Sequence, residues 1–330
     1  MLSRRFFLKG AALAAVGTVL DGAAHAASAP AAAAPRVSRQ APGYFRVQVG
    51  DADVTAIYDG GVFIPPNILH GATPEDIDAA LEAAFIDPKA GAPTAINAFL
   101  VDAGQGLVLV DTGVGTYFGD KGGLLVANIE AAGYKPEQVE AVLLTHLHSD
   151  HALGLVDGAG KALFPKAKVR VHEVDVAYWL RPGAESRVTE GQRKVLPALR
   201  AAVAPYQAAG TFAPFATGET PYPGFEAELN AGHTPGHCGY RVRSKGESIL
   251  FWGDIAHCMA VQFPQPGVTI DFDADQPQAA ASRKQLLSRA AREKFWVAGA
   301  HLPFPGIGRL QAVADGYAWW PAVYAVPSGV

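Results

Sequence analysis

The sequence predicts an α/β protein in which helices cover both faces of its sheets. Short apolar runs that are typical of buried strands alternate with longer stretches of helical periodicity, first in one half of the chain and again in the other. No short-period repeat is visible. Apolar residues make up 49% of the 330 residues and charged residues 18%, so the chain can build a large core.

The first half of the chain begins with two strands that we expect to pair, at 44–49 and 53–61. A helix should start after Thr73, because threonine is a good N-cap and the next residues are a proline and two acids. The runs INAFLVDAG and GLVLVDTG predict a hairpin. A helix that Gly133 ends and a buried strand over 141–145 should follow.

The second half of the chain repeats this alternation of predicted strands and helices. The apolar runs and their periodicity predict the following elements: a strand over 168–172, a helix around 187–205, strands over 225–232 and 248–254, a helix over 282–294 and a last strand over 295–300. Strands and helices therefore mingle in both halves, as they do in α/β proteins.

The first 26 residues resemble a twin-arginine export signal. SRRFFLKG contains adjacent arginines, and the apolar run AALAAVGTVL is too short to cross a bilayer. Small residues allow cleavage after Ala26, so we expect a periplasmic or secreted protein. A Sec-type signal or a frayed basic helix is the alternative interpretation. An Ala/Pro-rich linker over 27–41 follows, and the folded domain should span 42–330.

The charge of the chain argues against nucleic acid or an anionic membrane as its partner. The formal net charge is −4, and the body of the chain contains no run of lysines or arginines. Loss of the signal would remove Arg4, Arg5, Lys9 and Asp21, which carry +2 together, and would leave −6.

Cys238 and Cys258 are the two cysteines of the sequence. Two are too few for a disulfide framework or a thiolate metal cluster. They could form one bridge or be two small buried hydrophobes, and the sequence leaves both open. Neither lies near the cleavage point, so no lipid anchor is predicted.

Histidines and aspartates, residue types that commonly bind metals, follow four of the predicted strands. THLHSDH (145–151) comes directly after one strand, and three further residues follow three later strands. The full set is His146, His148, Asp150, His151, His233, Asp254 and His301. Each taken singly could be a solvated turn, a core histidine or a helix cap. Together they lie where α/β proteins build their sites, beyond the ends of buried strands. Because an open tetrahedral site takes three protein ligands, seven residues fit two ions better than one.

This pattern resembles the metallo-β-lactamase superfamily. The motif H-x-H-x-D-H, the stretch GHTPGH, the Gly-Asp pair and the final Ala-His carry the resemblance, which covers the chain from about residue 42 onward. It implies an αββα sandwich with a dinuclear site on one edge. It assigns one ion to His146, His148 and His233, and the other to Asp150, His151 and His301. Asp254 would bridge the two ions, and Asp111 and His237 would orient the ligands.

Two divalent ions at such a site predict hydrolysis. They lower the pKa of bound water to roughly 7, so a bridging hydroxide can act as nucleophile at neutral pH. The same charges would stabilise a developing oxyanion. Asp150 and Asp254 are therefore candidate catalytic residues as well as ligands. Imidazoles and carboxylates without thiolates suit zinc best, and cobalt, manganese or iron also fit.

Other stretches resemble the methyl parathion hydrolase family, exported organophosphate hydrolases within that superfamily. APGYFR, AVQF and HLPFPGIG carry this resemblance. It places Phe118 and Trp179 at aromatic positions of the substrate pocket and implies a homodimer. Leu196 and His257 are assigned to the same pocket but depart from the family pattern. His257 could be a hydrogen-bond donor, a proton shuttle or an altered wall.

The expected function is hydrolysis of small neutral phosphotriesters, with lactones or aryl esters as further substrates. A bridging aspartate is typical of phosphotriesterases, lactonases and thioesterases of the superfamily rather than of enzymes that open β-lactams. The first alternative is a quorum-quenching N-acyl-homoserine lactonase. A non-catalytic periplasmic metal-binding protein and an iron oxygenase of the same fold are the others.

Overall fold

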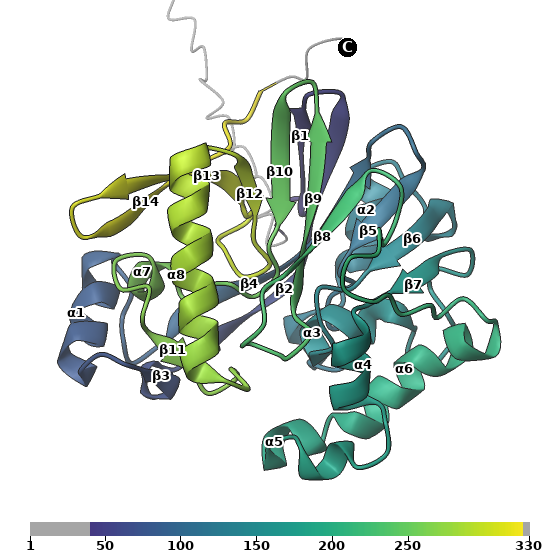
Figure 1. The fold of residues 1–330 in the computed structure, drawn as a ribbon, viewed down its shortest axis with the longest axis horizontal. Coiled ribbons are helices and arrows are strands. Elements are labelled where there is room, and N and C mark those ends of the chain that lie inside the picture. Colours follow the sequence, from purple (N-terminus) through teal and green to yellow (C-terminus); the bar gives the residue numbers. More distant parts are fainter. Residues whose placement is uncertain (1–39, 326–330) are drawn as a thin grey trace, which may run out of the picture. The chain divides into compact units, whose positions relative to one another are not determined.

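Residues 40–325 are described by the computed structural model, and they contain two six-stranded sheets that pack face to face between layers of helices (Figure 1). This is the αββα sandwich that the resemblance implied. The predicted signal over 1–26 lies outside the described residues, as does the predicted linker except for Gln40 and Ala41.

The first sheet has the strand order β1-β2-β4-β5-β6-β7. The bounds of its strands are β1 Tyr44–Val49, β2 Ala52–Ile64, β4 Ala92–Asp102, β5 Leu107–Val110, β6 Val139–Leu143 and β7 Lys168–Arg170. The strands from β1 to β5 pair antiparallel, and β5, β6 and β7 pair parallel. The predicted pairing at the N-terminus and the predicted hairpin are both confirmed.

The second sheet has the order β14-β13-β12-β10-β9-β8. Its strands are β8 Phe225–Leu229, β9 Cys238–Ser244, β10 Glu247–Phe251, β12 Trp296–Ala298, β13 Ile307–Val313 and β14 Gly316–Pro321. A small separate sheet pairs β3 Leu69–His70 with β11 Thr269–Ile270. The prediction that 295–300 is the last strand is wrong, because the chain turns back at 314–315 and adds the hairpin of β13 and β14.

The helices cover the outer faces of the sheets. The α-helices are α1 Pro74–Ala83, α2 Leu125–Ala131, α3 Ser149–Ala152, α4 Glu173–Trp179, α5 Glu190–Arg193, α6 Leu196–Ala208, α7 Met259–Gln262 and α8 Gln276–Glu293. The 3-10 helices are η1 Pro66–Ile68, η2 Gly119–Lys121, η3 Pro136–Gln138, η4 Leu153–Leu155 and η5 Ala184–Ser186. Among the described helices, none combines the length and the apolar character that a membrane span requires.

The predicted helix around 187–205 is in fact two helices, α5 and α6. Thr189 caps the short α5 through its side chain. Pro197 lies in the first turn of α6, where proline is favoured because the lost N–H has no partner within a helix. The chain therefore restarts a helix at this point instead of continuing one.

The core lies in three layers because side chains alternate along the strands. In β6, Ala141 and Leu143 point between the sheets, whereas Val142 points outward to α2 and α6. In β10, Phe251 points between the sheets and Leu250 points outward to α8. Figure 1 shows α8 (yellow-green) beside β12 and β13 at the left, and α6 (teal) below β7 at the right. With both faces buried, the strands hold their ends in fixed positions.

Candidate metal centre

The sandwich brings all seven predicted ligands together at one edge. The segment that starts at His146 follows β6 of the first sheet. His233, Asp254 and His301 follow β8, β10 and β12 of the second sheet. Both sheets therefore contribute residues, and the ligand atoms of these residues form groups within 4.8 Å of one another.

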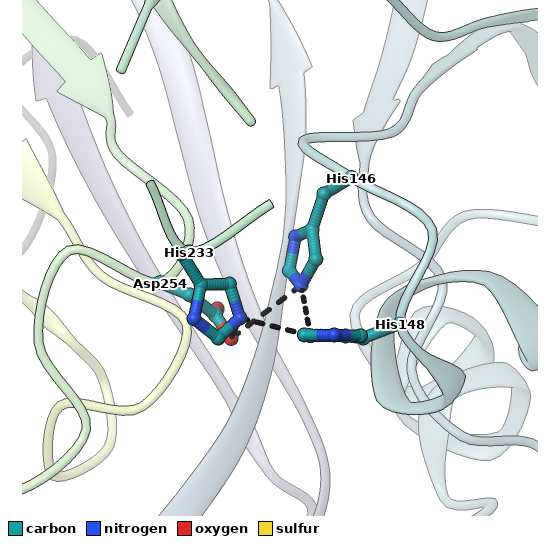
Figure 2. A group of neighbouring side chains, drawn as sticks. All are labelled: His146, His148, His233 and Asp254. Carbon is teal, nitrogen blue, oxygen red and sulfur yellow. Dashed lines mark hydrogen bonds and ion pairs between the residues drawn. The ribbon is translucent and has the colours of Figure 1, made fainter. Parts of the chain in front are cut away.

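The first group consists of His146, His148, His233 and Asp254 (Figure 2). Nδ1 of His148 lies 2.9 Å from Nε2 of His146 and 2.8 Å from Nε2 of His233. Asp254 Oδ2 lies 3.1 Å from His233 Nε2 and 3.6 Å from His146 Nε2. Figure 2 shows the ring nitrogens and the carboxylate pointing toward one common point. Three nitrogens and a carboxylate in this arrangement are a typical ligand set for zinc.

The second group consists of Asp150, His151 and His301. Nε2 of His301 lies 3.4 Å from both Nε2 of His151 and Oδ2 of Asp150. Asp254 also contacts this group, because its Oδ1 lies 3.0 Å from His151 and its Oδ2 lies 3.1 Å from His301. Asp254 thus contacts both groups, as a bridging carboxylate would.

In most of the ligand histidines, the ring nitrogen that points away from the cluster contacts a hydrogen-bond acceptor. If the inner nitrogens bind metal, Nδ1–H of His151 donates to Asp111 at 2.9 Å and Nδ1–H of His233 donates to Asp273 at 2.9 Å. Nδ1 of His301 lies 2.8 Å from the carbonyl oxygen of Ala95. His146 is held in the same way by the Thr145 hydroxyl at 3.0 Å. Such outer contacts fix the tautomer and the direction of a ligand ring.

The two residues to which the resemblance assigned an orienting role, Asp111 and His237, both contact predicted ligand residues. Asp111 holds His151 and also accepts hydrogen bonds from the backbone N–H and the hydroxyl of Thr145. His237 accepts the backbone N–H of Asp254 at 3.0 Å through Nε2. Burial, reinforced by the charge of His233, lowers the pKa of His237 to about 3, so the ring stays neutral and able to accept.

Asp273 and Asp175 are functional candidates that the sequence did not reveal. Asp273 is buried behind His233, with its other oxygen accepting the N–H of Ile270. Asp175 accepts the N–H groups of Leu147 at 2.7 Å and Gly236 at 3.1 Å, so it ties together the two ligand loops. Its partners lie 28 and 61 residues away along the chain, so no local sequence pattern reveals these contacts.

The electrostatics of the cluster favour a cation. Burial alone would raise the pKa of Asp254, but the histidines, His151 foremost, hold it well below its ordinary value. Burial opposes a charge on His233, yet Asp254 and Asp273 raise its pKa to about 9. These carboxylates therefore stabilise positive charge at a buried place, and a divalent ion meets the same demand.

The residues fit a pair of metal ions on a second ground. Without a cation, Oδ1 of Asp254 is buried with no hydrogen-bond partner, although His151 lies close to it. The inner nitrogens of His146, His148 and His233 also face one another at hydrogen-bond distance, where neutral rings cannot all supply a proton. An ion on each group would take up these lone pairs.

His257 lies beside the cluster and differs from the ligands. Its Nε2 is 3.1 Å from Asp254 Oδ2, and its ring stacks on that of His301 at 5.0 Å between centroids. Its Nδ1 is buried and has no hydrogen-bond partner. The ligand atoms of His257, Asp254 and His301 also lie within 4.8 Å of one another. Because the seven predicted ligands already supply three residues for each ion with Asp254 between them, we place His257 as a neighbour of this carboxylate rather than in the ligand set.

A cavity of about 700 Å³ opens onto the cluster. Phe118, Trp179 and His257, which the family resemblance assigned to a substrate pocket, line this cavity. Leu196 does not: it is buried in the core between α6 and the first sheet, and Val195 lines the cavity instead. The assignment of Leu196 to the pocket is therefore wrong by one residue, which on a helix turns a side chain by about 100°. The sequence analysis also missed two aromatic residues of the lining, Phe63 and Phe272.

The cysteines are free. Cys238 is buried between the two sheets, and Cys258 belongs to the separate apolar cluster around α1 and α7. They are two buried hydrophobes, and no bridge forms between them.

Fold and site together define a class of protein, an αββα sandwich with a histidine and aspartate cluster suited to two metal ions at one edge. The family model described as the metallo-beta-lactamase superfamily matches residues 91–298, and the chain belongs to this superfamily of metal-dependent hydrolases. Among curated proteins, no match was found.

Solved structures extend the likeness beyond the matched region. The crystal structure of hydrolase AbOPH of the beta lactamase superfamily is 37% identical, covers 87% of this chain and 100% of its own, and has a TM-score of 0.84. AidC, a dizinc quorum-quenching lactonase solved with a product, is 25% identical over 86% of this chain and 99% of its own, with a TM-score of 0.73. A probable metal-dependent hydrolase from Staphylococcus aureus shares the fold at 19% identity, with 85% and 100% coverage and a TM-score of 0.69.

Proposed function

We propose that the protein is a dinuclear metal-dependent hydrolase of small neutral esters, with phosphotriesters as its leading substrate class and lactones and aryl esters as further substrates. The observation that carries this proposal is the position of Asp254, which contacts both ligand groups at the floor of an aromatic cavity. The stretch HLPFPGIG supports placement in the methyl parathion hydrolase family.

The metal ions are proposed to be zinc. His146, His148 and His233 would hold one ion, Asp150, His151 and His301 the other, and Asp254 both. Imidazole and carboxylate ligands suit zinc, and AidC is a dizinc enzyme, although cobalt, manganese and iron also bind such sets. When bound, the ions supply Lewis-acid polarisation of a phosphoryl or carbonyl oxygen and acidify water.

The side chains of the protein would bind the substrate and hold the ligand residues in position. Phe63, Phe118, Trp179 and Phe272 form apolar walls that can bind an aryl leaving group and exclude water from the floor. Asp111 and Asp273 hold His151 and His233 in direction, so that the ligand set does not have to reorganise during reaction. His237 fixes the backbone of Asp254.

The test is a comparison of kcat/KM on the metal-loaded protein for methyl paraoxon, dihydrocoumarin, an aryl acetate, N-acyl-homoserine lactones of several chain lengths and a β-lactam. We expect turnover of the first three and little of the β-lactam. Inactivity on phosphotriester, lactone and aryl ester alike would refute the proposal.

The likeness to AidC favours a second candidate, a quorum-quenching lactonase. That function predicts strong dependence of kcat/KM on acyl length and poor turnover of methyl paraoxon in the same comparison. A non-catalytic metal-binding protein predicts stoichiometric metal with no turnover of any substrate. An iron oxygenase would show iron in metal analysis and consumption of oxygen.

We further propose export through the twin-arginine pathway with cleavage after Ala26, and assembly as a homodimer. SRRFFLKG supports the first of these proposals, and the methyl parathion hydrolase resemblance supports the second. The mass of the mature N-terminus tests the cleavage, and light scattering after size exclusion tests the dimer. A protein that keeps residues 1–26 or elutes as a monomer would refute the respective proposal.

A further inference from the structure

His148 differs from the other ligand histidines in the group that contacts its outer ring nitrogen, the one that points away from the cluster. His146, His151, His233 and His301 each have a hydroxyl, carboxylate or carbonyl acceptor at 2.8–3.0 Å from the outer nitrogen. His148 points Nδ1 at the cluster, so its outer nitrogen is Nε2. Within the described residues, the polar group recorded at this nitrogen is the side-chain amide of Gln192, with its nitrogen at 3.4 Å.

Gln192 is also part of the structure that begins α5. Its Oε1 accepts the backbone N–H of Thr189 at 3.0 Å, and the Thr189 hydroxyl accepts the backbone N–H of Gln192 at 3.2 Å. These reciprocal bonds form a capping box, which stabilises the start of a helix. Thr189, Gln192 and Val195 all line the cavity, so the segment 189–195, named here the α5 segment, is part of the pocket wall.

Two donors would need the same amide oxygen of Gln192, namely the backbone N–H of Thr189 and the Nε2–H of a metal-bound His148. A neutral ring that offers Nδ1 to a metal carries its hydrogen on Nε2, and this N–H needs an acceptor. The Gln192 amide has one oxygen, which is already bonded to the N–H of Thr189, and it turns its own donor nitrogen toward His148. A carbonyl oxygen has two lone pairs, but here the amide nitrogen faces His148, so the oxygen can accept from His148 only if the amide rotates.

We propose that Gln192 is a positioning residue for His148 and that it couples the α5 segment to the first ligand group. When Nδ1 of His148 binds metal, its Nε2–H would compete with the N–H of Thr189 for the Gln192 oxygen. Conversely, while this oxygen stays bonded to Thr189, His148 lacks an acceptor at its outer nitrogen. Because coupling is reciprocal, a ligand that orders the α5 segment changes metal affinity by the same factor as metal changes the affinity for that ligand. The inference rests on the proposed metal centre but not on the identity of the substrate.

The test measures zinc affinity by competition with a chromophoric chelator, and the absorption spectrum of the cobalt-substituted protein. Gln192→Ala removes the acceptor, and we expect about tenfold weaker zinc binding at one of two sites and an altered cobalt spectrum. Gln192→Glu offers two oxygens, one for each donor, so zinc binding should be at least as tight as in the wild type. Val195→Glu places the same charge on the same wall and controls for simple attraction of the cation.

Thr189→Pro gives the sharper result. The φ of Thr189 is −66°, which proline can adopt, and proline has no N–H to compete for the Gln192 oxygen. We therefore expect tighter zinc binding although the helix cap is lost. If the α5 segment only supports the fold, the same substitution weakens zinc binding.

Unchanged zinc affinity and cobalt spectrum in Gln192→Ala, or weaker zinc binding in Thr189→Pro, would overturn the coupling while leaving the metal centre in place. Gain of affinity in Val195→Glu equal to that in Gln192→Glu would also overturn it. A wild type that binds no zinc or cobalt would instead refute the metal centre itself, and the two failures are therefore distinguishable.

Discussion

The floor and the wall of the cavity are built in different ways. The ligand residues of the floor follow the ends of four strands, and His146, His233, Asp254 and His301 are themselves almost fully buried. The wall combines the end of β2, which carries Phe63, with α4, α5 and several loops, and Phe63 and Phe272 remain 65% and 44% exposed. We therefore expect the buried floor to determine the reaction class, whereas exposed side chains of the wall can be substituted, and substrate preference changed, without disturbing the core.

The largest effect should come from the one residue that contacts both ligand groups. Asp254→Ala removes the carboxylate that the surrounding histidines hold ionised, so at least one ion should be lost. We expect kcat/KM for the best substrate to fall by about 10²–10³-fold or more. Metal content by elemental analysis is the accompanying measurement. Asp254→Asn keeps the shape and isolates the charge, and activity near wild type in either variant would contradict a bridging role.

A neighbouring pair of residues, Val195 and Leu196, separates the wall from the core. Leu196 is 1% exposed in the core, so Leu196→Ala should cost about 2–5 kcal/mol of unfolding free energy. Val195 lines the cavity, so Val195→Ala should leave stability nearly unchanged and alter KM. Chemical denaturation and steady-state kinetics on both variants decide the matter. A changed KM in Leu196→Ala together with lost stability in Val195→Ala would show that Leu196, not Val195, lines the pocket.

This pair also shows why sequence analysis predicted the floor better than the wall. THLHSDH lies next to its strand, and ligand spacing of one or two residues survives any small error in the bounds of an element. The wall depends on helical phase, and the resemblance that assigned Leu196 to the pocket carries no information on the phase with which α6 begins after α5. Asp273 reaches His233 across 40 residues of chain, and no local pattern reports such a contact.

A pH dependence should arise from Asp175, which holds the two ligand loops together. Burial raises the pKa of this carboxyl to about 6 from its ordinary 3.8. The folded state then binds the proton more tightly than the unfolded state. The protonated carboxyl therefore stabilises the fold below about pH 4, and this contribution is lost as the pH rises through about 6.

Comparison of wild type with Asp175→Asn under the same metal conditions isolates this contribution. The variant loses an acceptor for Leu147 or Gly236, which should cost about 1–3 kcal/mol, but it cannot titrate. The advantage of the wild type in unfolding free energy should shrink by up to about 3 kcal/mol between pH 4 and pH 7. Denaturant titrations across this range measure it, and a constant difference would argue against a raised pKa.

The smallest effect tests whether the floor depends on its outer supports. Asp273→Asn weakens the acceptor behind His233, whose ring would then be held less firmly, and zinc affinity should fall by about 10–100-fold. Asp271→Asn is the matched control, because Asp271 lies two residues away, is exposed and pairs with His70 at the rim. Chelator competition compares the two variants. If Asp271→Asn weakens zinc as much as Asp273→Asn does, the support of the floor is general electrostatic attraction rather than a directed hydrogen bond, and the distinction between floor and wall loses its physical basis.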